Sequence, residues 1–292
     1  MNILVVGATG TLGRFLCRQL LDVGHHLVII GRNKSYDLIT DENLVYIQMD
    51  LTDINLRRLP VDIDVVYYLA QSRRYREFPD GAEDMLDVNI NAPVKLANWA
   101  VKHQISTFIY ASSGGVYPNP EEPVKEFFDI SLHKTSGFYI GSKLAAELLL
   151  NNYNEYFETF NILRPFFIYG PEQNEQMLIP RLIRNIQHQT PITINGDDGI
   201  VINPIYASDA AEVCVRLLEN KGTKIINVAG NEPISLKELA LKIGKELRIQ
   251  PVFSYIDKPA NNLIGDISLM KDVFVPQISL DEGIKRMIHN DI

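Results

Sequence analysis

The amino-acid sequence predicts an α/β fold built on a doubly wound parallel sheet, with a smaller part that is mostly C-terminal. Three observations predict it. Short apolar runs alternate with helical stretches through the first half, a glycine-rich turn follows the first run, and the pattern becomes irregular after about residue 164. Runs that are apolar throughout are typical of parallel strands buried on both faces. The loops that follow such strands lie along one sheet edge, where ligands bind.

The strands are expected where short apolar runs end in polar or glycine residues, and the helices where apolar residues recur at helical spacing. The expected strands are 3–6, 27–30, 45–49, 65–69, 108–111 and 160–163. The expected helices are 12–23, 82–103 and 139–157 in the first half, and 176–187, 208–220 and 235–247 in the second.

The composition excludes several classes of protein. The chain has 292 residues, 46% hydrophobic and 22% charged, which is typical of a soluble globular protein with a sizeable core. Its net charge of −8, without any basic run, argues against nucleic-acid binding. No apolar run approaches the ~18 residues of a membrane span. Cys17 and Cys214 lie far apart without a CxxC partner, so we expect free thiols and a cytoplasmic location. The histidines show no metal-ligand spacing, and no metal is expected.

A glycine-rich turn lies between the first expected strand and the first expected helix. Such a turn lets the backbone approach a pyrophosphate, and the helix N-terminus then offers free amides to the phosphates. The spacing GxxGxxG differs from the general GxGxxG, but its strand–turn–helix context favours dinucleotide binding. We expect residues 1–165, with returns around 202–230, to form a Rossmann-type NAD(P)-binding domain, and residues 166–292 to be mostly the substrate-binding part. The candidate cofactor-binding residues of the turn are Gly7, Thr9, Gly10, Thr11, Leu12 and Gly13.

The residues after the second strand bear on the choice of nicotinamide cofactor. NAD-specific sites usually carry a carboxylate there, whereas this chain has Gly31 followed by Arg32, whose cation could meet a 2′-phosphate. The sequence therefore favours NADP over NAD. Alternatively, Arg32 is a solvated loop residue and Asp50 or Asp37 serves NAD. Asp50 and Leu51, after the third strand, could contact the adenine, or Asp50 could simply start a turn.

Three polar side chains predict an acid–base site. Tyr139 and Lys143 lie four residues apart at the start of an expected helix, so both project from one face. A lysine ammonium near a tyrosine hydroxyl favours the phenolate and lowers the tyrosine pKa. Such a tyrosine can give a proton to a carbonyl or take one from an alcohol. Ser112 and Ser113 follow the fifth strand, and Ser113 is the candidate second donor to the substrate oxygen.

These residues belong to a set of motifs spread along almost the whole chain. They are GATGTLG (7–13), YYLAQ (67–71), DVNINAPVKLA with Asn89, ASSGGVY (111–117), YIGSK (139–143), RPFFIYGP (164–171), INPIYASDAA (202–211), INVAGNEPISLKELA (226–240) and ISLDEGIKRMI (278–288). With them the chain resembles an extended short-chain dehydrogenase/reductase of the NAD-dependent epimerase/dehydratase family.

The resemblance implies residue roles. Ser113 holds the reacting oxygen, Tyr139 is the acid/base, and Lys143 also bonds the nicotinamide ribose. It also implies a homodimer formed through helices 82–103 and 139–157. The residues that it places around the cofactor are Leu69, Ala70, Gln71, Asn89, Ser112, Pro165 and Ile168.

Departures from the family pattern narrow the reaction. Family 4,6-dehydratases carry acidic residues directly after the Ser113 equivalent, where this chain has Gly114 and Gly115, so dehydratase chemistry is not expected. Nucleotide-sugar epimerases often have asparagine where Phe167 stands, and an arginine around 201–202. Arg181 or Arg184 could replace these phosphate contacts.

Several functions remain open at this point. We expect hydride transfer at a C–OH or C=O carbon of a sugar or nucleotide sugar, by an epimerase or a 4-ketoreductase. Arg32 favours a reductase, and the family resemblance favours an epimerase. The alternatives are an NADPH-dependent reductase of a non-sugar carbonyl and a non-catalytic dinucleotide-binding regulator. Likewise, Arg73, Arg74 and Arg76 form either a clamp for a substrate anion or a solvated basic loop.

Overall fold

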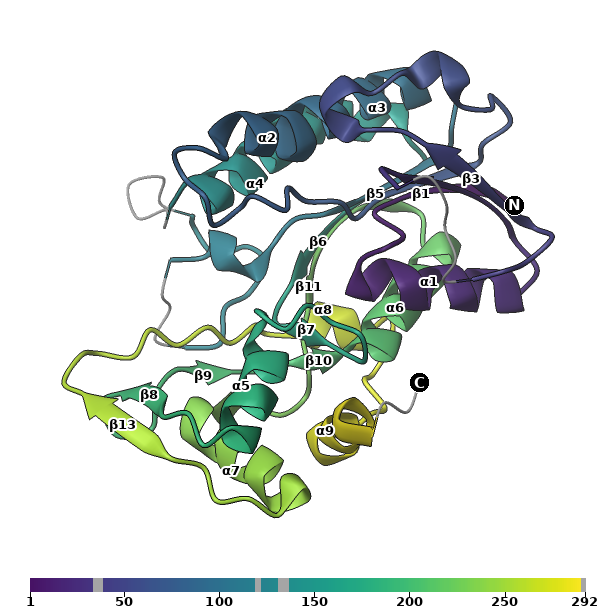
Figure 1. Cartoon of the computed structure of the whole chain (residues 1–292). Helices are drawn as coiled ribbons and strands as arrows, with labels where there is room; N and C mark the ends of the chain where they lie inside the picture. Colours follow the sequence, from purple (N-terminus) through teal and green to yellow (C-terminus); the bar gives the residue numbers. More distant parts are fainter. Residues whose placement is uncertain (34–38, 119–121, 131–136, 290–292) are drawn as a thin grey trace.

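A computed structural model describes residues 1–33, 39–118, 122–130 and 137–289, so Asp37 lies outside the described residues. Its centre is a seven-stranded sheet in the order β11-β6-β5-β4-β1-β2-β3, parallel throughout (Figure 1). The six predicted strands are confirmed within one or two residues. The bounds are β1 Asn2–Val6, β2 His26–Gly31, β3 Leu44–Gln48, β4 Val65–Tyr68, β5 Thr107–Ala111, β6 Thr159–Pro165 and β11 Gly222–Val228.

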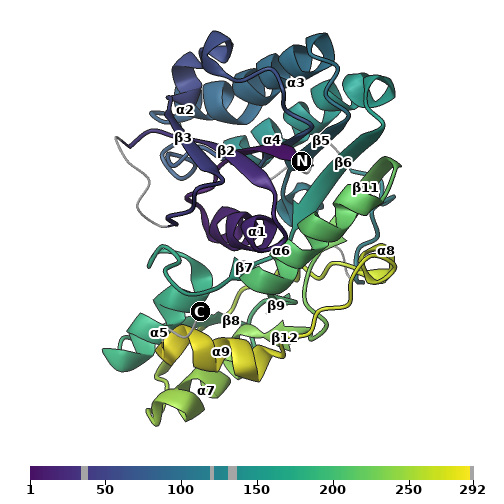
Figure 2. The ribbon, with the colours of Figure 1, turned by 90° about the vertical axis from the view of Figure 1, so that its right-hand side faces the viewer.

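Helices cover both faces of this sheet, which confirms the doubly wound fold (Figures 1 and 2). Helices α1 (Thr11–Asp22) and α6 (Ala207–Arg216) lie on one face, and α2 (Ala82–Leu86), α3 (Ala92–Lys102) and α4 (Gly137–Leu150) lie on the other. A π-helical turn (Asp87–Asn91) joins α2 to α3, so the predicted helix 82–103 is continuous but irregular. The predicted helix 139–157 ends in 3₁₀ turns after Leu150.

Alternation along β1 explains why its apolar run is continuous. Ile3 and Val5 pack into the core on the α1 and α6 face, whereas Leu4 and Val6 pack into the core under α3 and α4. Because successive side chains of a strand point to opposite faces, a strand covered on both sides needs apolar residues at every position.

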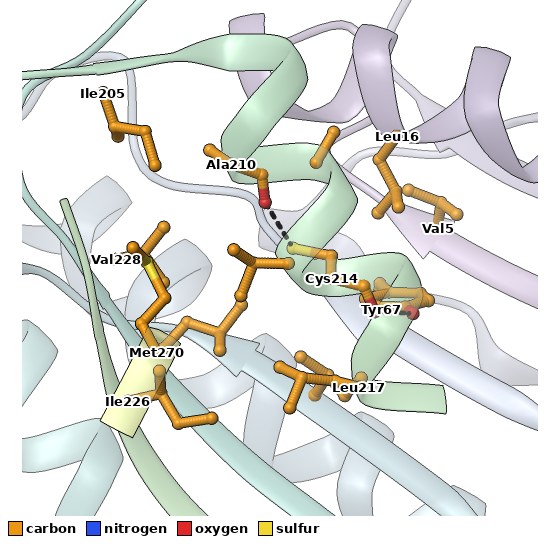
Figure 3. Packing of buried hydrophobic residues seen from close by; sticks show 14 of the residues in the cluster. Val5, Leu16, Tyr67, Ile205, Ala210, Cys214, Leu217, Ile226, Val228 and Met270 are labelled. Atoms are coloured by element: carbon orange, nitrogen blue, oxygen red, sulfur yellow. Dashed lines mark hydrogen bonds between the residues drawn. The ribbon is translucent and has the colours of Figure 1, made fainter. Parts of the chain in front are cut away.

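Both cysteines lie in the core between α1, α6 and the sheet. Figure 3 shows Cys214 among apolar side chains, with its thiol donating to the Ala210 carbonyl at 3.4 Å. The Tyr67 hydroxyl donates to the Cys214 carbonyl at 2.8 Å. Burial raises the pKa of Cys17 and of Cys214 to about 12, so both thiols stay protonated. The expectation of free thiols is confirmed.

Most of the remaining elements form a second lobe with its own apolar core, below the sheet in Figure 1, whereas Met270 of α8 packs into the core of the sheet. Side chains of α5, α7 and α9 meet in this core, and the predicted helices of the second half are confirmed. No helix of the described ranges is long and apolar enough to cross a membrane. The bounds are β7 Ile168–Tyr169, α5 Leu178–Gln187, β8 Ile192–Asn195, β9 Val201–Ile202, β10 Ile205–Tyr206, β12 Ile234–Ser235, α7 Leu236–Leu247, β13 Phe253–Ile256, α8 Ser268–Lys271 and α9 Leu280–His289.

Candidate active site

The predicted site residues gather along one edge of the sheet, because all its strands are parallel and their carboxyl ends meet there. The glycine turn follows β1, Arg32 follows β2, and Asp50 and Leu51 follow β3. Pro165 ends β6, and Ile168 begins the short strand β7 three residues later. Three residues follow β4 and two follow β5: Leu69, Ala70, Gln71, Ser112 and Ser113.

The glycine turn packs so tightly that side chains do not fit in it. Gly7 has a φ of +98°, and a Cβ there would lie 2.7 Å from the amide nitrogen of Ala70. A Cβ at Gly13 would lie 2.2 Å from the carbonyl oxygen of Gly7. Helix α1 begins after Gly10, which has no side chain to cap the first amides. These amides are therefore free to bind an anion, as a dinucleotide site requires.

Ser112 supports the same conclusion from the other side of the edge. Its hydroxyl oxygen is buried and has no hydrogen-bond partner among the residues that the structure describes. Buried hydroxyls are nearly always paired in folded proteins, so an orphan beside a ligand site indicates a partner that arrives with the ligand. The glycine turn and Ser112 both fit a bound nicotinamide dinucleotide.

Packing accounts for the missing acid after β2. A Cβ at Gly31 would lie 2.8 Å from the hydroxyl oxygen of Tyr46, which itself donates to the Asn33 carbonyl at 2.6 Å. The Tyr46 ring thus occupies the space that an aspartate at position 31 would need. Arg32 is exposed. Asp50 accepts from the amide and the hydroxyl of Thr52, both at 3.0 Å, so it starts a turn.

The acid–base candidates come together at the start of α4. The Tyr139 hydroxyl donates to Gln71 Oε1 at 2.6 Å, and Ser113 lies near enough to lower the Tyr139 pKa. The Lys143 ammonium donates to the carbonyls of Ala111 at 2.9 Å and Ala70 at 3.4 Å. Tyr139 and Lys143 therefore sit between the loops that follow β4 and β5.

Burial dominates the electrostatics of these groups. It raises the pKa of Tyr139 well above its ordinary value, although Ser113 acts in the opposite direction. Burial also lowers the pKa of Lys143 to about 7, against the opposing effect of Glu147. In the protein without cofactor, burial therefore raises the Tyr139 pKa, in the direction opposite to the effect that Lys143 was predicted to have.

Asn89 links the loop after β4 to α4. Its side chain is fully buried in the π-helical turn, accepts from the Ser72 amide at 2.9 Å and donates to the Ser142 hydroxyl at 2.9 Å. Ser142 in turn donates to the Tyr139 carbonyl at 2.7 Å. The side-chain amide that was expected to flank the cofactor is thus already bonded to protein groups on both sides.

Gly114 and Gly115 stand where a dehydratase carries acids, and packed side chains lie close to both. A Cβ at Gly114 would lie 2.7 Å from ring atoms of the buried Phe166, and one at Gly115 would lie 2.6 Å from Ile140 Cδ1. Side chains at these positions would displace packed residues. The structure therefore gives a steric reason for the two glycines.

The arginines after β4 make contacts outside the acid–base cluster. Arg74 is exposed and pairs with Glu77 at 2.7 Å. Arg76 is also exposed, lies 5.0 Å from the ring centroid of Tyr75 and donates to the Gln176 carbonyl at 3.3 Å. Both arginine side chains are thus open to solvent in these contacts. Tyr75, between these two arginines, packs against the site: its ring centroid lies 5.3 Å from that of Tyr139.

A buried polar network behind α4 escaped the sequence analysis. Arg164 on β6 donates to both carboxylate oxygens of Glu147, to the Tyr117 hydroxyl at 2.7 Å and to the Glu126 carbonyl at 3.1 Å. Asn227 on β11 accepts from Tyr117 and donates to neighbouring carbonyls. A glutamate four residues after Lys143, on an otherwise apolar helix face, was the signal that could have revealed it.

Comparisons with known proteins identify the family of this chain and agree with its fold. The sequence model described as "NAD dependent epimerase/dehydratase family" matches residues 3–229. An uncharacterized UDP-glucose epimerase, YtcB, from Bacillus subtilis is 28% identical over 99% of this chain and 97% of its own. The UDP-glucuronate 4-epimerase of Thermodesulfobacterium geofontis is 27% identical, over 98% of this chain and 94% of its own. A solved UDP-glucuronic acid 4-epimerase from Bacillus cereus, in complex with UDP-glucuronic acid and NAD, superimposes with a TM-score of 0.86 at 27% identity, covering 98% of this chain and 97% of that one.

The solved neighbours correct the prediction of the cofactor. The Bacillus cereus 4-epimerase is complexed with NAD. The preference for NADP over NAD was therefore wrong. It rested on the absence of an acid at Gly31, which the Tyr46 ring explains, and on the charge of Arg32, which is exposed to solvent.

Proposed function

The chain belongs to the NAD-dependent epimerase/dehydratase family, and from this premise we propose that it is an NAD-dependent 4-epimerase of a UDP-linked sugar. One observation carries the proposal: the Tyr139 hydroxyl is held by Gln71 close to Ser113, while glycines stand where a dehydratase needs acids. A tyrosine and a serine suffice to move a proton at one sugar oxygen, and epimerisation requires no further acid.

The proposed roles follow from the contacts. A bound NAD would supply the hydride chemistry at the sugar carbon. The glycine turn and the N-terminus of α1 hold its pyrophosphate, and Ser112 gains a partner from it. Ser113 holds the reacting oxygen, from which Tyr139 removes the proton and to which it later returns it. Lys143, fixed by two carbonyls, supplies the positive charge that favours the Tyr139 phenolate.

The substrate diphosphate needs a cation, because Phe167 and residues 201–202 lack the usual donors. Arg181 is the better of the two candidate arginines. Arg181 lies one helical turn after Met177, so the two side chains share a helix face. The sulfur of Met177 lies 3.6 Å from the hydroxyl of Tyr75, the residue whose ring packs beside Tyr139. Arg184 is already paired with Glu175 at 3.4 Å. We assign the diphosphate to Arg181.

The protein is proposed to act as a homodimer through α2, α3 and α4. Exposed leucines on α2 and α4, Leu86, Leu148 and Leu149, leave apolar surface on this side of the sheet. Light scattering at micromolar concentration should give twice the mass of the chain, and Leu148→Glu should halve it. A monomeric wild type would contradict the dimer. The proposed location is cytoplasmic, where two free buried thiols stay reduced.

The function is tested in two steps. Freshly purified protein is denatured and the released nucleotide identified by mass; stoichiometric NAD is expected, because an epimerase recovers its hydride in each cycle. The protein is then incubated separately with UDP-glucuronic acid, UDP-glucose and UDP-N-acetylglucosamine, and the 4-epimers are quantified by chromatography. Tyr139→Phe should retain NAD and lose about 10²- to 10⁴-fold in turnover. Failure to convert any of the three, or unchanged turnover in Tyr139→Phe, would contradict the proposal.

A further inference from the structure

Two consecutive residues of the loop after β4 contact the two members of the YxxxK motif. The Ala70 carbonyl accepts from the Lys143 ammonium, and the side-chain amide of Gln71 accepts from the Tyr139 hydroxyl at 2.6 Å. The second contact is the shorter and uses a side chain that has both an acceptor and a donor end. Gln71 therefore holds the hydroxyl that the reaction must protonate and deprotonate.

We propose that Gln71 is a positioning residue for Tyr139, and that its amide stays hydrogen-bonded to the tyrosine oxygen in both protonation states. The oxygen of the amide accepts from the phenol, as observed. When Tyr139 is a phenolate, the amide turns over and its Nε2 group donates to the negative oxygen. This inference rests on the proposed function, in which Tyr139 alternates between the two states.

The hydrogen bond between Gln71 and Tyr139 is part of a closed ring of hydrogen bonds. Gln71 is followed by Ser72, whose amide donates to Asn89, and Asn89 donates to Ser142, which donates to the carbonyl of Tyr139 itself. The two partners of the Gln71–Tyr139 bond are thus tied together a second time, through the buried Asn89 side chain. A hydrogen bond between groups that are held in this way is already in place before the substrate arrives.

The other groups that face Tyr139 are not placed to bond its hydroxyl oxygen in both protonation states. Lys143, on the same helix, donates to two carbonyls. Tyr75 raises the pKa of Tyr139, and Tyr139 raises the pKa of Tyr110. Neither of these tyrosines therefore stabilises a Tyr139 phenolate. Ser113 lies near Tyr139 and lowers its pKa, and in the proposed function its hydroxyl is needed by the substrate oxygen. No carboxylate accompanies the Tyr139 hydroxyl in the contacts of the described residues.

The proton balance of each half-reaction is then complete. The sugar O–H bond breaks, the Tyr139 O–H bond forms, and Gln71 changes from donor to acceptor. In the return step the proton goes back to the same sugar oxygen, and Gln71 changes back. A hydrogen bond to the charged phenolate is stronger than one from the neutral phenol, so the net effect of Gln71 is to lower the pKa of Tyr139 in the working enzyme.

The test compares the pH dependence of kcat in the wild type and three variants, all carrying NAD. Gln71→Met keeps the length of the side chain and removes both hydrogen-bonding ends, whereas Gln71→Glu keeps an acceptor and adds a negative charge. We expect Gln71→Met to lower kcat by about 10- to 100-fold and to shift the acidic limb upward by about one pH unit. Gln71→Glu should shift it further. Gln187→Met, the same change on an exposed glutamine of α5, should leave kcat and the profile as in wild type.

Each outcome decides the proposal. A Gln71→Met enzyme with wild-type kcat overturns it, and so does one whose kcat falls while the acidic limb stays in place, since that is a structural defect only. An inactive wild type contradicts the epimerase assignment instead. The inference is then decided by the crystal structure of the wild type with NAD bound: a retained Gln71–Tyr139 contact supports it, and a Gln71 side chain turned away from Tyr139 overturns it.

Discussion

The carboxylate of Glu147 on α4 accepts two hydrogen bonds from the guanidinium of Arg164 on β6, at 3.1 and 2.6 Å. Both side chains are about 95% buried, and Arg164 also lies 4.8 Å over the ring of Tyr117. Because Glu147 is one helical turn beyond Lys143, this pair fixes α4 against the sheet at the height of the proposed active site.

Removing one partner of this pair should destabilise the protein strongly. Glu147→Gln leaves a buried guanidinium without its counter-charge, and we expect a loss of about 3–5 kcal/mol in the free energy of unfolding. The double variant Glu147→Leu/Arg164→Met should recover most of that loss, since no unpaired charge remains. Urea denaturation measures both. A single variant as stable as wild type would show that the pair contributes little.

Lys143 should be a stability cost in the protein without cofactor. Burial lowers its pKa from 10.5 to about 7. The unfolded chain therefore binds this proton more tightly, so the cost is fully present below pH 7 and falls as the pH rises from about 7 toward about 10.5. Lys143→Met should raise Tm by at least about 2–4 °C at about pH 6, and by less at about pH 9, while abolishing turnover.

The control for this prediction is Lys271→Met, on an exposed lysine of α8. Its effect on Tm should be small and equal at both pH values. If Lys143→Met lowered Tm equally at both, the buried ammonium would not be the source of the pH dependence.

Two glycines near Tyr139 should respond oppositely to the same substitution. Gly114→Ala places a methyl group 2.7 Å from the Phe166 ring, which is buried and stacked on Tyr117, so a loss of about 1–3 kcal/mol is expected. Gly141→Ala, within α4, meets nothing within 4 Å and should stabilise by about 0.5–1 kcal/mol. Equal effects in thermal unfolding would contradict this account of the two positions.

Arg181→Met tests the proposed diphosphate contact. If Arg181 binds the diphosphate, KM for the UDP-sugar should rise by about 10-fold or more while bound NAD and Tm stay unchanged. Arg248→Met, at the end of α7, is the matched control and should leave KM unaltered. A KM unchanged by Arg181→Met would move the diphosphate to another residue.

The strands and the acid–base cluster could be predicted from the sequence because their signals are local. The buried runs of β1 and β5 and the four-residue spacing of Tyr139 and Lys143 each lie within one element. Strand β11 was missed because its first three residues are exposed and only Ile226–Val228 are fully buried, which leaves too short an apolar run.

Features that depend on distant contacts could not be predicted in this way. Glu147 and Arg164 are 17 residues apart, and Gln71 and Tyr139 are 68 apart. The cofactor prediction failed for the same reason: Gly31 was interpreted from its neighbour Arg32, whereas its space is occupied by Tyr46 from the adjacent strand.

The sheet order has a consequence for synthesis of the chain. Strand β6 is complete at Pro165, but its partner β11 begins only at Gly222, after α5, β8 and α6 have been made. During translation the edge of β6 therefore stays unpaired while more than fifty residues emerge from the ribosome. An open, apolar strand edge is prone to pair with other chains. We expect nascent chains that stop between these two strands to aggregate or to bind chaperones, and chains released after Val228 to close the edge themselves.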